Sequence, residues 1–151
     1  MNTASRAGTA ILCVLMLIFI AVALAICRVI TISFSVLAVL AAVCGLLGLV
    51  LVALSARRGG SRVQKGMLIL AGISAAGMPI SAILHNLVYG LFIAWFGEGI
   101  WGSGGDEPVF FLVAILVFPV LFVASAAAAA VLLLRERIAG SRNARPREAA
   151  G

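Results

Sequence analysis

Four long apolar runs dominate this chain of 151 residues, at positions 8–26, 32–54, 67–95 and 109–134. A helix needs roughly 20 residues to cross about 30 Å of hydrocarbon, so each run is long enough to span a bilayer. Backbone groups inside lipid must find hydrogen-bond partners within the protein, which favours helices over irregular segments. The sequence therefore predicts an all-α fold, a four-helix transmembrane bundle.

Composition and connector lengths define the domain organisation. Hydrophobic residues make up 64% of the chain and charged residues 11%, whereas soluble domains have roughly 45–50% and roughly 25%. The connectors between the runs are short, so residues 1–134 are expected to form one domain. Residues 135–151 are polar and contain Pro146, which predicts a disordered tail.

The first run is open to two interpretations. Arg6 gives it a basic start, and Ala21–Ala25 offers small residues of the kind that signal peptidase cleaves after. The run is longer than the roughly 7–15 apolar residues of a signal core, and a second run follows closely. A retained helix is favoured, and cleavage near residue 25 stays the alternative.

Basic residues set the predicted orientation, because Lys and Arg are retained on the cytoplasmic side of a membrane. They are concentrated in the second connector and in the tail: Arg57, Arg58, Arg62, Lys65, Arg135, Arg137, Arg142, Arg145 and Arg147. The other two connectors hold Arg28 on its own and a group of acidic residues. Both termini are therefore expected to be cytoplasmic. The compact, multi-pass chain is expected in a plasma membrane, the inner membrane of a prokaryote.

The net charge of +6 has a simple explanation in this setting. Basic clusters beside membrane spans anchor topology and attract anionic lipid. No basic stripe with interleaved aromatic residues is present, so nucleic-acid binding is not expected. The predicted partners are the lipid bilayer, anionic lipid at its cytoplasmic face, and either a membrane-protein partner or further copies of the chain.

The third run contains the single histidine of the chain, His85, next to Asn86. Ser81 and Tyr89 lie four residues before and after His85, so a helix places these three on one face. His85 follows Met67 by 18 residues, or about 27 Å of helix, which is close to the outer edge of the hydrocarbon. It is then within reach of the acidic third connector.

These positions form the candidate functional polar cluster: Ser81, His85, Asn86, Tyr89, Glu98, Asp106 and Glu107. One interpretation is that its hydrogen bonds hold helices together. The other is that His85 is a titrating group or a ligand.

The same connector is expected to form a cap outside the membrane. Aromatic residues cluster around it, as in an interfacial belt: Tyr89, Phe92, Trp95, Phe96, Trp101, Phe110 and Phe111. Asp106 is expected to cap the fourth helix, with Pro108 in its first turn.

No motif for catalysis or for a cofactor accompanies these features. One histidine with carboxylates at unrecognised spacing does not predict zinc, and a lone histidine does not predict haem. The cysteines Cys13, Cys27 and Cys44 form no CxxC pair, and no serine lies in a GxSxG motif. The sequence predicts a protein that is not an enzyme and has no metal or cofactor.

Two prolines lie deep inside spans and are hinge candidates. Pro79 lies about 18 Å into the third run and Pro119 about 15 Å into the fourth, counted from opposite faces at 1.5 Å per residue. Each removes a backbone donor and frees a carbonyl, that of Ala75 or Ile115, so kinks are expected at one depth. Static kinks are the alternative to a hinge. Paired helix discontinuities also occur at transporter sites.

Small residues at four-residue spacing predict close helix packing. The pairs are Ala41 and Gly45, Cys44 and Gly48, Gly72 and Ala76, Gly77 and Ser81, followed by the alanine-rich stretch 124–130. A bundle of this kind, with an acidic and aromatic outer cap, is typical of a structural or accessory membrane subunit. The alternative function is a subunit of an oligomeric small-molecule transporter or channel.

Overall fold

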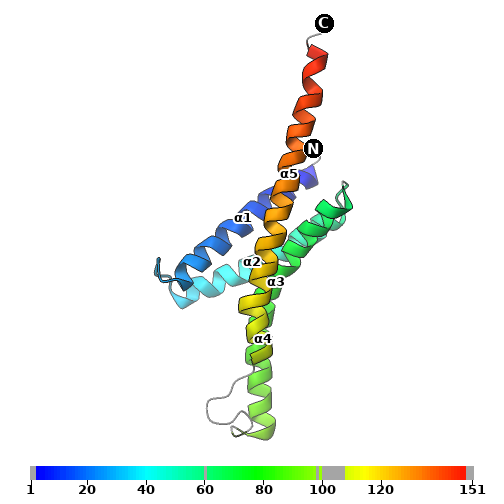
Figure 1. Ribbon diagram of the computed structural model, residues 1–151. Helices are drawn as coiled ribbons and strands as arrows, with labels where there is room; N and C mark the ends of the chain where they lie inside the picture. Colours follow the sequence, from blue (N-terminus) through cyan, green and yellow to red (C-terminus); the bar gives the residue numbers. More distant parts are fainter. Residues whose placement is uncertain (1–2, 60, 98, 100–107, 149–151) are drawn as a thin grey trace.

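The computed structural model describes residues 3–59, 61–97, 99 and 108–148, and this part of the chain contains helices and no strands (Figure 1). The elements in order are α1 (Thr3–Ile26), α2 (Phe34–Ala56), α3 (Arg62–Phe96), α4 (Pro108–Leu112), the π-helix η2 (Val113–Val117) and α5 (Phe118–Glu148). The last three follow one another without a gap. We refer to α4, η2 and α5 together as the fourth helix.

Four helices are long and apolar enough to cross a membrane: Ser5–Ile26, Phe34–Ala56, Arg62–Phe96 and Pro108–Glu136. The prediction of an all-α fold with four helices long and apolar enough to span a membrane is confirmed for the described residues. They indicate a multi-pass membrane protein. The orientation of the termini and the identity of the membrane stay predictions.

Local hydrogen bonds set the ends of the helices. The Ser33 hydroxyl accepts a bond from the Val36 amide at 3.4 Å at the start of α2, and the Ser61 hydroxyl accepts one from the Gln64 amide at 3.2 Å at the start of α3. At its other end α3 stops at Gly97, whose φ of 81° a glycine adopts without strain. Helix α3 thus extends beyond its apolar run, because its caps lie outside the part that suits lipid.

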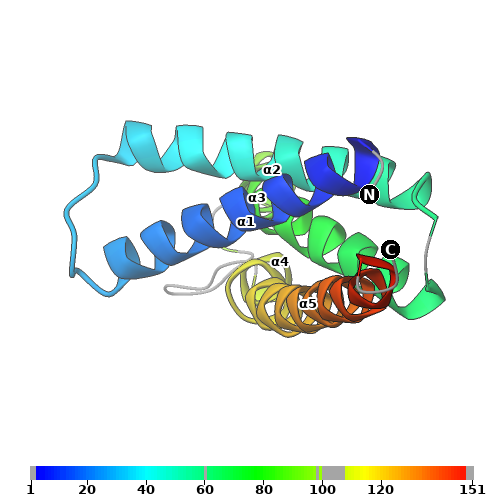
Figure 2. The ribbon, with the colours of Figure 1, turned by 90° about the horizontal axis from the view of Figure 1, so that it is seen from above.

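Helix α3 is the central element. It packs against α2 on one side and against α5 on the other, while α1 packs on α2 (Figure 2). The rings of Phe19 in α1 and Phe122 in α5 lie 5.2 Å apart. The core consists of side chains from all four helices, among them Leu12, Leu15, Leu51, Leu68, Ala75 and Phe122.

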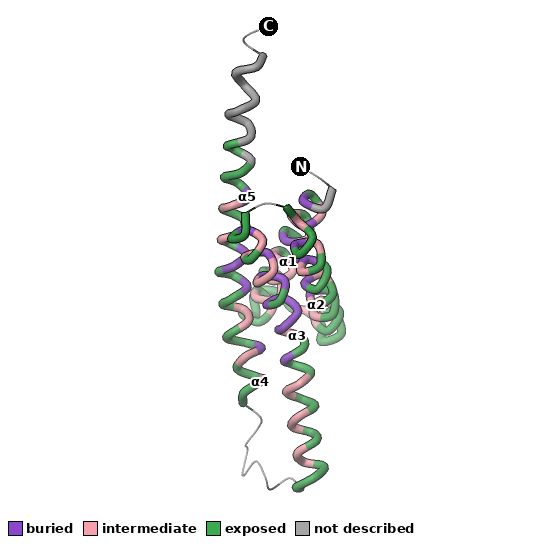
Figure 3. Tube along the Cα trace, turned by 90° about the vertical axis from the view of Figure 1, so that its right-hand side faces the viewer, coloured by how far each residue is buried: buried purple, intermediate pink, exposed green. Residues whose placement is uncertain are grey.

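The two halves of α3 have different neighbours. Its buried residues all lie between Gln64 and Ser81, and its second half is half-buried or exposed (Figure 3). The first half runs beside α2, and the second half continues in a different direction beside α4. Pro79 lies inside the helix where these halves meet. A kink and a hinge at Pro79 stay predictions.

Glycines allow α2 and α3 to pack with their backbones in contact. A Cβ atom on Gly48 would lie 2.6 Å from the carbonyl oxygen of Gly72, and one on Gly72 would lie 2.7 Å from the carbonyl oxygen of Gly48. These distances are shorter than any carbon–oxygen contact in a relaxed structure. A Cβ on Gly77 would likewise overlap the ring of Phe118 in α5. The small residues Gly48, Gly72 and Gly77 thus lie at close helix contacts, as their four-residue spacing predicts.

The end of the chain differs from its prediction. Residues from 135 onward are expected to be disordered, but α5 continues as a helix to Glu148. This segment contains Ala, Arg and Glu, which have favourable helix propensities. Extending an existing helix also avoids the cost of nucleating a new one. Pro108, by contrast, starts α4 as expected.

We expect Gly48→Ala to lower the free energy of unfolding by about 1–3 kcal/mol, because the added methyl group would force α2 away from α3. Gly90→Ala is the matched control, since Gly90 has open space around its Cα atom. Titration of the purified protein with a denaturing detergent, followed by circular dichroism, measures both. Equal effects of the two substitutions would contradict the backbone contact between α2 and α3.

Candidate functional site

An apolar pocket of about 310 Å³ lies between the four helices. Its lining includes Phe19 and Val22 of α1, Leu40 and Cys44 of α2, Met78 and Pro79 of α3, and Ala114 and Pro119 of the fourth helix. The described residues that line it are all apolar, apart from the thiol of Cys44. The site is therefore chemically suited to a hydrocarbon group.

Both hinge candidates line this pocket. Pro79 and Pro119 were expected at one depth from residue counts, and the fold brings them to the same pocket. Phe118 directly follows η2 and Pro119 comes next; the Phe118 amide donates to the carbonyl of Val113 in place of the regular helical bond. Such π-helical turns are rare and occur often at functional sites. The pocket thus lies where two helices depart from straight α-helical geometry.

Cys44 compensates for the hydrogen bond that Pro79 removes. A proline at position 79 cannot donate to the carbonyl of Ala75. The buried Cys44 Sγ lies 3.7 Å from that carbonyl oxygen and donates to it. A weak thiol donor from α2 therefore satisfies a group that α3 leaves open. This contact was not predicted, because sequence spacing does not show which residue of another helix meets the freed carbonyl.

The pocket limits the chemistry of the site. An ion or a sugar entering the membrane needs polar groups that replace its hydration shell. The described lining offers one thiol for this purpose, and that thiol already contacts Ala75. Apolar ligands lose no hydrogen bonds on entering, so the pocket favours lipid chains or apolar side chains.

The predicted polar cluster is divided by the fold. Ser81 is buried, and the ring of His85 lies 5.4 Å from the ring of Phe111 in α4. Tyr89 is half-buried and takes part in contacts of its own. Asn86 is exposed, and its amide donates to the carbonyl of Ala82 in the same helix at 2.8 Å. His85 thus contacts the fourth helix, while Asn86 forms this hydrogen bond within α3.

The acidic members of that cluster, Glu98, Asp106 and Glu107, lie outside the described residues, and so does Trp101. The expected contact between His85 and the third connector therefore stays a prediction. Among the contacts of His85 is the aromatic one with Phe111. It places His85 next to the first turns of the fourth helix, directly after that connector.

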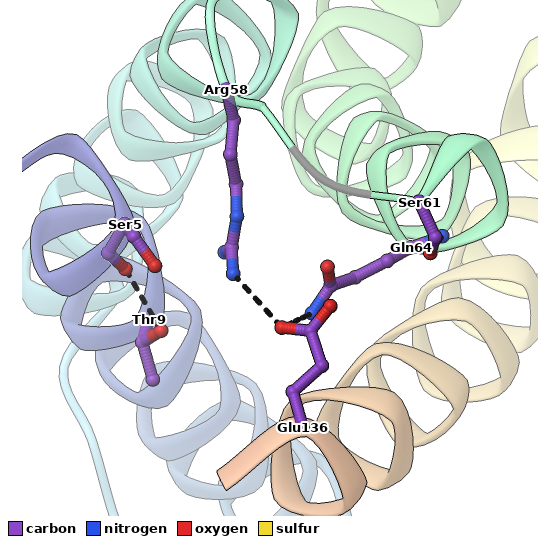
Figure 4. A network of polar contacts seen from close by, with 6 residues as sticks. All are labelled: Ser5, Thr9, Arg58, Ser61, Gln64 and Glu136. Atoms are coloured by element: carbon purple, nitrogen blue, oxygen red, sulfur yellow. Dashed lines mark hydrogen bonds and ion pairs between the residues drawn. The ribbon is translucent and has the colours of Figure 1, made fainter. Parts of the chain in front are cut away.

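A second polar cluster was missed by sequence reasoning. The Nε2 atom of Gln64 donates to Oε2 of Glu136 at 3.0 Å, and Nη2 of Arg58 lies 3.7 Å from the same oxygen (Figure 4). These residues join the α2–α3 connector to α5. The sequence assigned Arg58 to topology alone. The sequence signal for this cluster was Glu136, a single acidic residue between Arg135 and Arg137 in an otherwise basic segment.

Within the described residues no group of three His, Cys, Asp or Glu side chains is placed to hold a metal ion. Cys13 and Cys27 are exposed, Cys44 is buried, and all three are free thiols. Comparison of the chain with protein-family models, curated proteins and solved structures finds no match. A proposal about its function therefore rests on the pocket and the polar contacts of the chain itself.

We expect His85→Ala to loosen the third connector, because it removes the ring contact between α3 and α4. An aromatic contact contributes about 0.5–1.5 kcal/mol, so labelling of a cysteine placed at Ser103 should become about two- to twelvefold faster. The measurement uses a variant in which Cys13, Cys27 and Cys44 are replaced by serine or alanine.

Two variants serve as controls. Asn86→Ala should leave the labelling rate unchanged, because the Asn86 amide bonds within α3. His85→Phe should restore the original rate if ring packing alone is required. An unchanged labelling rate in His85→Ala would contradict the proposed coupling. Labelling that is as fast in His85→Phe as in His85→Ala would instead point to the imidazole nitrogens.

Proposed function

We propose that this protein is an accessory subunit of a membrane assembly, in the plasma membrane of a prokaryote and with both termini in the cytoplasm. In this role it binds another membrane protein and performs no chemical conversion. The observation that carries the proposal is the pocket between the four helices, whose described lining is apolar apart from Cys44. Such a pocket suits an apolar side chain of a partner or a lipid chain better than a polar solute.

A second feature supports a partner helix. The alanine-rich stretch of α5 has two faces: Ser125, Ala126 and Ala129 are buried in the bundle, while Ala124, Ala127 and Ala130 are exposed. Small residues let helix backbones approach closely in lipid, where apolar surface alone gives no preference for protein over lipid. The outer alanine face thus resembles the inner one that α3 already covers.

The second candidate function is that of a subunit of a small-molecule transporter. It is favoured by one observation, that Pro79 and Pro119 line the same pocket. Discontinuities in two helices at one depth are typical of transporter sites. The apolar lining restricts this candidate to hydrophobic substrates.

The accessory role predicts that the protein purifies from its own membranes in a mild detergent with a second protein in fixed stoichiometry. Native mass spectrometry measures this ratio. Ala127→Leu, which enlarges the outer alanine face, should lower the recovery of the partner severalfold. Ala53→Leu, the same change at an exposed position of α2, should leave it unchanged.

The opposite results distinguish the two functions. A protein that purifies as a monomer or homo-oligomer in every mild detergent contradicts the accessory role. Flux of a hydrophobic dye in liposomes that Pro79→Ala and Pro119→Ala abolish would support the transporter. Absence of flux together with a stoichiometric partner leaves the accessory role as the function.

A further inference from the structure

A buried cation lies at the α2–α3 end of the bundle. The side chain of Arg58 is 7% exposed and points inward between α1, α3 and α5 (Figure 4). Arg57 and Arg62 are exposed, and the Nζ atom of Lys65 donates to the carbonyl of Ala56 at 2.6 Å. Three further basic residues thus lie close in sequence to a guanidinium that water hardly reaches.

The guanidinium of Arg58 has fewer partners than its burial requires. Its ion pair with Glu136 measures 3.7 Å, whereas hydrogen-bonded pairs of this type measure about 2.7–2.9 Å. The same carboxylate oxygen already accepts a bond from Gln64 at 3.0 Å. The Nη1 atom of Arg58 is buried and has no hydrogen-bond partner. A buried charged donor in this state is unfavourable, so the site has unused capacity for an anion.

Glu136 leaves a route to this donor. Its side chain is 50% exposed. Because water already reaches the carboxylate, Glu136 can turn outward into solvent. Such a rotation would release Arg58 from its long ion pair and admit an oxygen atom of another anion. Gln64 is 1% exposed and remains in place as a second donor.

We propose that Arg58 binds the phosphate group of an anionic lipid, with the Gln64 amide as a second donor and Arg57 and Arg62 as the surrounding charge. The site lies between the end of one membrane span, at Ala56, and the start of the next, at Arg62. Lipid phosphates lie at this level, just outside the hydrocarbon. The planar guanidinium fork fits a phosphate with two parallel hydrogen bonds. This inference is independent of the accessory role.

The test compares two substitutions that remove the same charge. Native mass spectrometry counts bound lipids while the protein in detergent is titrated with phosphatidylglycerol, and phosphatidylcholine serves as the zwitterionic reference. Arg62→Gln should weaken phosphatidylglycerol binding about fivefold, the effect of one surface cation. Arg58→Gln should weaken it about ten- to hundredfold, because a hydrogen-bonded charge is lost.

Glu136→Gln is expected to strengthen binding, since it removes the carboxylate that competes with phosphate for Arg58. This variant separates the site from a purely structural network, in which it would weaken folding and leave lipid binding unchanged. Circular dichroism and gel filtration show whether Arg58→Gln folds. If it does not, lipid binding by Glu136→Gln alone tests the phosphate site. Unchanged or weaker binding in Glu136→Gln would then overturn the proposal.

Two further results would also overturn it. If Arg58→Gln and Arg62→Gln weaken phosphatidylglycerol binding equally, the lipid is attracted by the overall positive charge and not by a defined site. Binding of inorganic phosphate that depends on Arg58, without binding of phosphatidylglycerol, would assign the site to a free anion instead of a lipid. A larger loss in Arg58→Gln, with tighter binding in Glu136→Gln, supports the lipid phosphate site.

Discussion

The contact between the backbones of Gly48 and Gly72 is the constraint on which the rest of the bundle depends. Apolar side chains gain little by leaving lipid for protein, so helices in a membrane associate through close packing and hydrogen bonds. Glycine at both positions brings α2 near enough to α3 for carbonyl oxygens to lie where a Cβ atom would be. Neighbouring contacts follow from this approach. A Cβ on Gly45 would lie 3.1 Å from Cγ of Pro79, and the Cys44 thiol reaches the carbonyl of Ala75.

Departures from regular helix geometry create the pocket next to this contact. Pro79 and the π-turn before Pro119 each disturb the hydrogen-bond ladder of a helix, and the pocket lies between them. The fold satisfies the buried carbonyl of Ala75, which Pro79 leaves without its helical donor, with the Cys44 thiol, a donor small enough to leave the pocket apolar. The result is a site in the membrane span that can receive a hydrocarbon group and has little to offer an ion.

Polar chemistry is instead found near the two ends of the bundle. His85 contacts Phe111 beside the aromatic connector, and Arg58 contacts Glu136 beside the basic one. The first contact is of modest strength and couples α3 to α4. The second leaves a buried donor without a partner, which is costly unless an anion or a water molecule meets it. This difference makes the basic end the better candidate for ligand binding.

The sequence by itself determined the number of helices long enough to span a membrane and the small-residue spacing that brings α2 and α3 together. These properties depend on local composition and on distances along a helix, both of which residue counts describe. It did not reveal the Cys44–Ala75 bond, the shared pocket or the Arg58–Gln64–Glu136 cluster. It also predicted a disordered tail, where α5 continues to Glu148. Tertiary structure decided these features, because they depend on the rotation of each helix about its axis and on the partners that it meets.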